Sequence, residues 1–230
     1  MESDSRIIEI TMDRINRTLL YWINSLTFLS GGINVAAIVA YSITVSHLTG
    51  NLSKLPIDLE RGDFTSAYAL VGVILMFLLG STISGILIGE KNFTFGKRYG
   101  WTLEIMAFIL ISSQIILDGG KSLIYVLAFL MGLQNGLFIM YKGAVTRTTH
   151  VTGSFTDLGI YLGHYLKGDK TVLWRIKYYI YNIFSFAIGG GVGATGYSFF
   201  SENFFYFLGI GYIIAGAFYF RLRKKYQNLI

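Results

Sequence analysis

The chain has 230 residues, of which 53% are hydrophobic and only 14% are charged, and it contains a single proline. A soluble protein rich in loops would carry more charge and more proline, so this composition indicates a membrane protein. The absence of cysteine excludes disulfides, thiolate catalysis and cysteine-ligated metals. The formal charge of +6 comes from residues that flank apolar runs, which argues against nucleic-acid binding.

Six apolar runs follow one another along the chain, each about as long as the ~20 residues that cross ~30 Å of hydrocarbon. They cover residues 19–46, 66–89, 101–117, 123–141, 178–200 and 204–220. The sequence therefore predicts an all-α fold, an integral membrane helical bundle with six transmembrane helices. No linker divides the chain, so residues 1–230 are expected to form one domain.

The basic residues predict the orientation of this bundle. With six spans both termini lie on one side, and that side holds all 19 basic residues except Lys54, Arg61 and Lys121. Because cytoplasmic loops carry an excess of Lys and Arg, we expect both termini to be cytoplasmic. The tails, residues 1–18 and 221–230, precede and follow the spans, and the first shows no signal-peptide pattern.

A motif that follows the first span returns after the fourth span. The copies are His47-Leu48-Thr49-Gly50-Asn51 and His150-Val151-Thr152-Gly153-Ser154, preceded by Gly31-x-x-Asn34 and Gly132-x-x-Asn135 and followed by Phe77-x-x-Gly80 and Phe186-x-x-Gly189. Three spans separate the copies, which places them on opposite sides of the membrane. The pattern predicts a 3+3 inverted-topology repeat, with halves at about residues 19–117 and 122–220, as in many secondary transporters.

The stretches from Leu19 to Ser46 and from Ser122 to Thr149, which contain the first and fourth spans, are longer than a straight crossing requires, and each has glycine and asparagine near its middle. Because glycine weakens a helix and a buried amide needs polar partners, we expect a kink or interruption at residues 31–34 and 132–136. After each of these spans, Thr-Gly and apolar residues at helical spacing predict a short amphipathic helix at the interface or re-entering the membrane. The apolar stripes are Leu52, Leu55 and Leu59, and Phe155, Leu158, Leu162 and Leu166.

These signatures resemble those of a known family. The matching segments are Thr49-Gly50-Asn51, Gly132-Leu133-Gln134-Asn135 and the long run from Arg147-Thr148-Thr149-His150 to Thr156-Asp157-Leu158-Gly159. They resemble the YoaK-like family of six-span bacterial membrane proteins over about residues 19–225. The resemblance implies a multi-pass protein of the bacterial plasma (inner) membrane, and it implies no substrate, because the family is a domain of unknown function. Family members commonly carry aspartate at the position of Asn34, so coupling through that carboxylate does not transfer to this chain.

Symmetry would bring Asn34 and Asn135 together near the midplane, where inverted-repeat transporters bind substrate. The alternative is that each amide only bonds a neighbouring helix. The Thr-Gly pairs of the motif also offer backbone N–H groups to an anion at the start of each short helix, unless Asn51 or Ser154 caps that helix. The substrate-binding candidates are Asn34, Asn135, Thr49, Gly50, Thr152 and Gly153.

Three titratable residues are candidates for gating or proton relay. His47 and His150, expected at opposite membrane faces, titrate in the physiological range, although an interfacial histidine often serves only the fold. Glu104 lies inside an apolar run, where an acid indicates function by default, or it pairs with Lys97 or Arg98 near the membrane surface. No metal site or cofactor is expected.

Two further patterns have structural interpretations. Arg147 and Asp157 bracket the second motif and are expected to form an ion pair. Gly191-x-Gly193-x-x-Gly196 has the glycine spacing of a dinucleotide-binding motif. That motif requires a strand before it, and none is predicted here, so we do not expect a dinucleotide site. Small residues over 189–196 instead predict close helix packing.

The sequence favours a small secondary transporter or channel-like permease with a midplane site between the repeats. The alternative is a non-transporting scaffold or regulatory protein that acts through its basic cytoplasmic face. No catalytic constellation is apparent, so an enzyme is not expected. The expected partners are the lipid bilayer and an unknown small solute, with a homo-oligomer left open.

Overall fold

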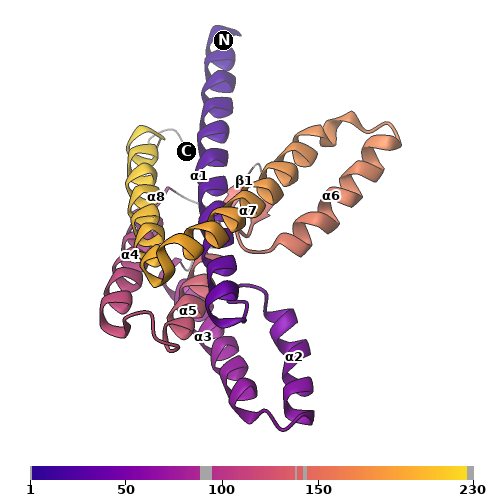
Figure 1. Ribbon diagram of the computed structural model, residues 1–230. Helices are drawn as coiled ribbons and strands as arrows, with labels where there is room; N and C mark the ends of the chain where they lie inside the picture. The colour runs from indigo at the N-terminus through magenta and orange to yellow at the C-terminus, as the bar shows by residue number, and fades with distance from the viewer. Residues whose placement is uncertain (1, 89–94, 138, 142–143, 227–230) are drawn as a thin grey trace.

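The computed structural model describes residues 2–88, 95–137, 139–141 and 144–226 (Figure 1). The last residue of the predicted second span and residues 227–230 of the predicted C-terminal tail lie outside this part. The helices are α1 (Glu2–Tyr41), α2 (Leu48–Glu60), α3 (Phe64–Ile88), α4 (Lys97–Leu117), α5 (Leu123–Asn135), α6 (Val151–Leu166), α7 (Leu173–Phe200) and α8 (Phe204–Tyr226), with short 3-10 turns η1 (Lys170–Val172) and η2 (Ser201–Asn203). A small antiparallel hairpin joins β1 (Ile139–Tyr141) to β2 (Ala144–Thr146).

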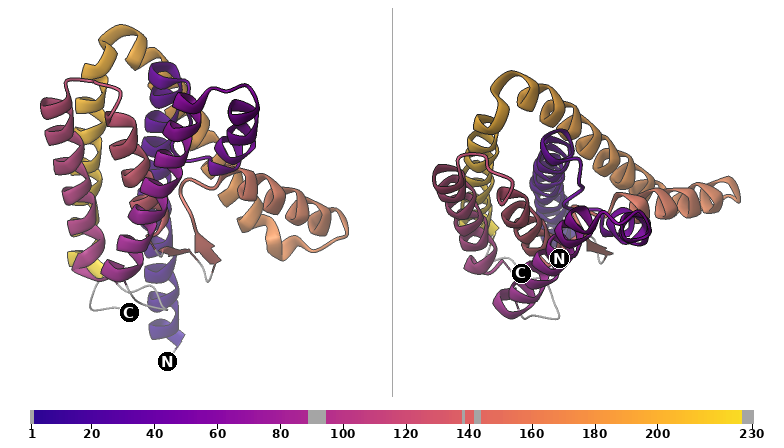
Figure 2. Two further views of the ribbon diagram at one scale, coloured as in Figure 1. Left: turned by 90° about the horizontal axis from the view of Figure 1, so that it is seen from below. Right: turned by 60° about the horizontal axis from the view of Figure 1, so that its bottom comes forward.

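Within the described residues, four apolar helical stretches are long enough to cross a membrane. They are Asp13–Tyr41, Phe64–Ile88, Lys97–Leu117 and Lys170–Tyr226, the last of which contains both α7 and α8. The chain is therefore a helical membrane protein, as its composition predicted. Figure 2 shows the two chain ends on one side of the bundle, and the α4–α5 and α7–α8 connections on the other.

The predicted fourth span is wrong as a single helix. Helix α5 ends at Asn135 and measures about 20 Å, too short to cross ~30 Å of hydrocarbon. The β1–β2 hairpin follows it, with Ile139 paired to Thr146. The helix thus ends inside the predicted interruption at residues 132–136. Helix α1 runs through residues 31–34 as one continuous helix, so of the kink or interruption predicted there, the interruption is wrong.

Aromatic side chains fill the core where α1, α4 and α8 meet. Trp22 is fully buried and packs against Tyr99 and Tyr219, with ring centroids 6.4 and 4.7 Å away. The indole N–H of Trp22 donates to the Ala215 carbonyl at 3.2 Å. This bond satisfies the polar end of a ring that supplies a large apolar surface.

Glycines let two pairs of helices touch along their backbones. Helix α1 crosses α7 so closely that a Cβ at Gly31 would overlap the Phe186 carbonyl oxygen, and a Cβ at Gly189 would overlap that of Phe28. Such contacts need residues without side chains at the crossing, as is common between membrane helices. The close packing predicted for residues 189–196 is confirmed at this crossing.

Helices α3 and α5 cross in the same manner. A Cβ at Gly80 would overlap the Phe129 carbonyl oxygen, and a Cβ at Gly132 would overlap that of Phe77. The crossing of α3 with α5 and that of α1 with α7 therefore use the same residue pattern, a phenylalanine carbonyl against a glycine in both directions.

The two short helices form where the sequence predicts them, and their apolar stripes point outward. In α2 the buried residues are Asn51 and Asp58, whereas Leu52 and Leu59 are about half exposed. In α6 Ser154 is the buried residue. The exposed apolar residues of α6 include Phe155, Leu162 and Leu166. Both helices thus present polar groups to the protein and apolar groups to its surroundings.

Candidate functional site

The segment between α1 and α2 doubles back along α1. The side-chain Oδ1 of Asn34, a residue 3% exposed, accepts hydrogen bonds from the backbone N–H groups of Val45 and Ser46, both at 3.1 Å. Asn34 lies about two turns, or about 10 Å, before the end of α1 at Tyr41. Because residues 42–47 return to this level, α2 begins beside the interior of α1 rather than at its end.

The segment before α6 is held in a related way. The Oδ1 of Asn135 accepts a hydrogen bond from the Thr149 hydroxyl at 2.6 Å, and the Ser30 hydroxyl donates to the Thr148 carbonyl at 3.0 Å. Residues 147–150 therefore lie against α1 and the end of α5. We call residues 42–47 and 147–150 the first and second lead-in segments.

A buried polar network fixes the second lead-in segment. Gln134, which is 1% exposed, donates through Nε2 to the Leu26 carbonyl at 2.9 Å and to the Thr148 hydroxyl at 2.8 Å. The Tyr212 hydroxyl donates to the Oε1 of Gln134. The sequence motif contains Gln134 but predicts no role for it, and the Tyr212 hydroxyl gives no signal within an aromatic-rich helix.

Asn182 of α7 was also missed. Its side chain donates to the Thr27 hydroxyl at 2.9 Å and accepts from the Ser154 hydroxyl at 3.1 Å, so it joins α1, α6 and α7. A lone amide in an apolar run was the available signal, since such a group needs buried partners.

The predicted capping of the short helices by Asn51 and Ser154 is not what the structure shows. The residues at the N-cap positions are His47 and His150, and neither side chain makes a capping bond. Asn51 donates instead to the Thr44 carbonyl at 2.8 Å, and the Ser154 hydroxyl donates to the His150 carbonyl at 3.2 Å. Both side chains therefore tie their helices to the lead-in segments.

The loop that joins α2 to α3 and the loop that joins α6 to α7 have the same local structure. Gly62 and Gly168 adopt φ values of +74° and +100°, which glycine reaches without strain. Asp63 then accepts from the Ser66 N–H at 3.1 Å, and Asp169 accepts from the Thr171 N–H at 3.0 Å. Hydrogen bonds from Ser66 lower the pKa of Asp63, and those from Thr171 lower the pKa of Asp169.

A polar cavity of about 400 Å³ opens beside the second lead-in segment. Residues from β2, the lead-in segment, α6 and α7 line it: Thr146, Arg147, His150, Gly153, Ser154, Asp157, Tyr178 and Tyr179. The His150 imidazole lies over Gly153, where a Cβ would overlap the ring. Arg147 and Asp157 share the cavity, but no ion pair joins them within the described residues, so that prediction is wrong.

The two histidines lie near one another rather than at opposite faces. The His47 ring makes an edge contact with Phe186, at 5.5 Å between centroids, and its Nδ1 is 3.2 Å from the Ser46 hydroxyl. Burial lowers the pKa of His47, and the positive charge of His150 lowers it further. The two motif histidines thus lie in one region, where α2 and α6 begin, with His47 half-buried and His150 exposed.

The remaining candidates divide into two groups. Thr49, Gly50 and Thr152 are exposed in the first turns of α2 and α6, and a Cβ at Gly50 would meet no atom within 4 Å. Glu104 lies elsewhere, in a groove between α4 and α8, against Gly216. Among the described residues no cluster of three His, Asp or Glu side chains is placed to hold a metal.

Comparison with known proteins gives a family and no activity. The model of the family described as "Protein of unknown function (DUF1275)" matches residues 23–218. No curated protein and no solved structure matches the chain. The matched region includes both lead-in segments, both short helices and both glycine crossings. The chain therefore belongs to the DUF1275 family, the YoaK-like family that its signatures indicated.

Proposed function

We propose that this protein is a small secondary transporter or channel-like permease whose solute site lies where α2 and α6 begin. The observation that carries the proposal is the doubling back of both lead-in segments, each held by the asparagine of a Gly-x-x-Asn motif. A helix that starts inside a membrane protein presents free N–H groups and the positive end of its dipole to the interior. Transporters use such half-helices to bind solutes.

The proposal includes an inverted duplication of three spans. Its support is the reciprocal glycine packing, in which Gly31 and Gly189 on one pair of helices correspond to Gly132 and Gly80 on the other. When each residue is replaced by its counterpart in the other sequence copy, the contacts of the α1–α7 crossing become those of the α3–α5 crossing. A twofold axis in the membrane plane would relate them, and α5 with the β1–β2 hairpin would correspond to α1.

The outward apolar stripes support re-entry of α2 and α6 into the bilayer. A helix lying at the membrane surface turns its polar side to water, whereas α2 turns Asn51 and Asp58 to the protein. Its leucines would then face lipid. Non-helical backbone at membrane depth is tolerated where protein covers it, as Asn34 does for the first lead-in segment.

The chemistry of the site favours a small anion with a single charge. Thr152-Gly153 would supply backbone N–H groups, and His150 and Arg147 line the cavity beside them. In the first copy Thr49 would contribute, whereas the Gly50 N–H already donates to the His47 carbonyl at 3.2 Å. Asn34 and Asn135 would position the helix starts, because their amide oxygens already accept hydrogen bonds. His47 and His150 would sense pH at this site, while Glu104, which faces another groove, would act separately if it relays protons.

Cytoplasmic termini remain part of the proposal. Figure 2 shows both chain ends on one side, where α8 ends in a run of basic residues. Single cysteines at Glu60 and Lys224 test the orientation in intact cells. We expect an external thiol reagent to label the first and spare the second, and the reverse pattern would contradict it.

Transport itself is tested by swelling of vesicles that contain the purified protein. Salts of small anions such as formate, nitrate and chloride are compared with urea and glycerol, and empty vesicles are the reference. We expect faster swelling with at least one anion. If no solute enters faster than in empty vesicles, the transport proposal fails.

The alternative is a scaffold or regulatory protein, and one observation favours it. The hairpin of α6 and α7 projects from the bundle (Figure 1) and exposes Phe155, Leu166 and Phe184. A protein partner or a second copy would cover these side chains. In that case, substitution of Phe155 by Ser would abolish the complex, and vesicle swelling would be absent in the wild type.

A further inference from the structure

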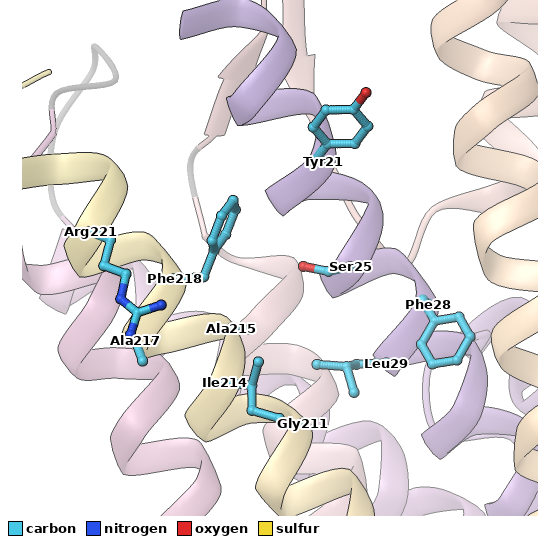
Figure 3. A pocket seen from close by; sticks show the side chains of 10 residues that line it. All are labelled: Tyr21, Ser25, Phe28, Leu29, Gly211, Ile214, Ala215, Ala217, Phe218 and Arg221. Carbon is cyan, nitrogen blue, oxygen red and sulfur yellow. The ribbon is translucent and has the colours of Figure 1, made fainter. Parts of the chain in front are cut away.

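An apolar groove of about 460 Å³ runs between α1 and α8 (Figure 3). Its apolar lining includes Phe28, Leu29, Ile214 and Phe218. Helices α1 and α8 are antiparallel here, so Tyr21 and Arg221 lie toward one end of the groove and Leu29 and Gly211 toward the other. The α8 residues that line it extend along about 15 Å of the helix.

Arg221 turns toward this groove. In Figure 3 its side chain runs back along α8, and the guanidinium lies beside Ala217. Neighbouring arginines are engaged with the protein: Arg223 donates to the Phe95 carbonyl at 2.8 Å, and Arg17 pairs with Asp13 at 3.1 Å. Within the described part of the chain, Arg221 has no ionic or hydrogen-bonding partner.

We propose that the groove between α1 and α8 binds an anionic phospholipid, with an acyl chain along the groove and the phosphate on Arg221. The apolar lining matches an acyl chain, and a guanidinium binds two phosphate oxygens at once. The exposed Tyr21 ring lies at the same end, as expected of an aromatic residue at the headgroup level.

Charge selects the anionic lipid over a neutral one. The last turn of α8 adds Arg223, Lys224 and Lys225 near the same end of the groove. Basic pockets between membrane helices on the cytoplasmic side bind anionic headgroups. A helix from a second copy would leave Arg221 against apolar surface unless it carried an acid, so a lipid matches the groove better. This inference does not depend on transport activity.

The experiment measures lipids retained by the purified full-length protein in native mass spectra, after titration with phosphatidylglycerol or phosphatidylcholine. We expect preferential retention of phosphatidylglycerol. Arg221→Gln should weaken it about tenfold, since it removes a charge-assisted contact. Lys224→Gln removes an equal charge beside the groove and should change retention less than twofold.

A second pair of variants tests the acyl chain. Ala217→Phe fills the groove and should reduce retention of both lipids, whereas Ile213→Phe, one turn earlier on α8, lines the Glu104 groove instead and should not. Equal losses for Arg221→Gln and Lys224→Gln would overturn the phosphate contact. Unchanged retention in Ala217→Phe, or a lipid-free dimer lost in that variant, would overturn the lipid as occupant of the groove.

Discussion

The two copies of the His-x-Thr-Gly motif begin similar helical hairpins, α2 with α3 and α6 with α7, but their hydrogen bonds and packing differ. Asn34 binds the backbone of the first lead-in segment, whereas Asn135 binds a threonine hydroxyl of the second. The space over Gly50 is open, whereas the imidazole of His150 occupies the space over Gly153. The shared glycine and asparagine positions thus specify the path of the chain, while the residues between them decide where a polar cavity forms.

The largest expected effect concerns the glycine crossings that both copies share. Gly31→Leu and Gly132→Leu should each destabilise the protein by more than ~3 kcal/mol, because the new side chain meets backbone that cannot yield. The measure is the yield of monodisperse protein after extraction. Gly191→Leu is the control, since a Cβ there meets no atom within 4 Å. A normal yield for Gly132→Leu would contradict the close crossing.

The next effect separates the two asparagines. Asn34→Leu leaves two buried N–H groups without their acceptor, at a cost of about 1–3 kcal/mol each. Asn135→Leu removes one hydroxyl bond, worth about 1 kcal/mol. Thermal unfolding in detergent should therefore show a larger decrease in Tm for Asn34→Leu.

Asn34→Asp is the informative control for this pair, because a carboxylate oxygen can still accept both bonds. We expect it to keep a Tm near that of the wild type. A large loss in Asn34→Asp, or equal losses in the two leucine variants, would mean that the amide oxygen of Asn34 does not hold the first lead-in segment.

A smaller effect on stability, but a clear one on flux, is expected at the motif glycines. Gly153→Ala should displace the His150 imidazole and reduce anion-driven swelling about tenfold, the equivalent of ~1.4 kcal/mol. Gly50→Ala introduces the same methyl group into open space. Similar flux in both variants would show that anion flux does not depend on the packing of His150 over Gly153.

The smallest effect follows from His47. Its lowered pKa means that folding favours the neutral ring, so the stabilisation exists above the usual histidine pKa of ~6.5 and is lost as pH falls below it. Wild-type Tm should therefore decrease from pH 7 to pH 5. His47→Gln should flatten this decrease more than His164→Gln, a substitution in the last turn of α6.

Much of the fold was predictable from simple periodicity. The long apolar runs became α3, α4, α7 and α8 within a few residues, and the leucine spacing predicted α2 and α6. The end of α5 was not predictable in detail, because an apolar run of this length fits a helix or a helix followed by strands. The β1–β2 hairpin forms here because it is buried against α1 and α7: Ile139 is almost fully buried, and Thr146 is hydrogen-bonded to Tyr178.

The candidate site was predictable in position but less so in its partners. The motif identified Asn34, Asn135 and both histidines, yet their bonds depend on how residues 42–47 and 147–150 return along the helices. The path of these two segments depends on tertiary packing, which a local sequence pattern does not contain. The same limitation hid Tyr212, a hydroxyl among many aromatic residues, and it left open which way the apolar stripes of α2 and α6 face.

The glycine crossings have a consequence for any working cycle. Backbone contacts without intervening side chains leave little freedom to slide, so α1 with α7, and α3 with α5, should each move as one rigid block. Each block takes one helix from the first half of the sequence and one from the second. If access to the site alternates, the α1–α7 block would therefore move against the α3–α5 block. The two sequence repeats would then not be the units that move relative to one another.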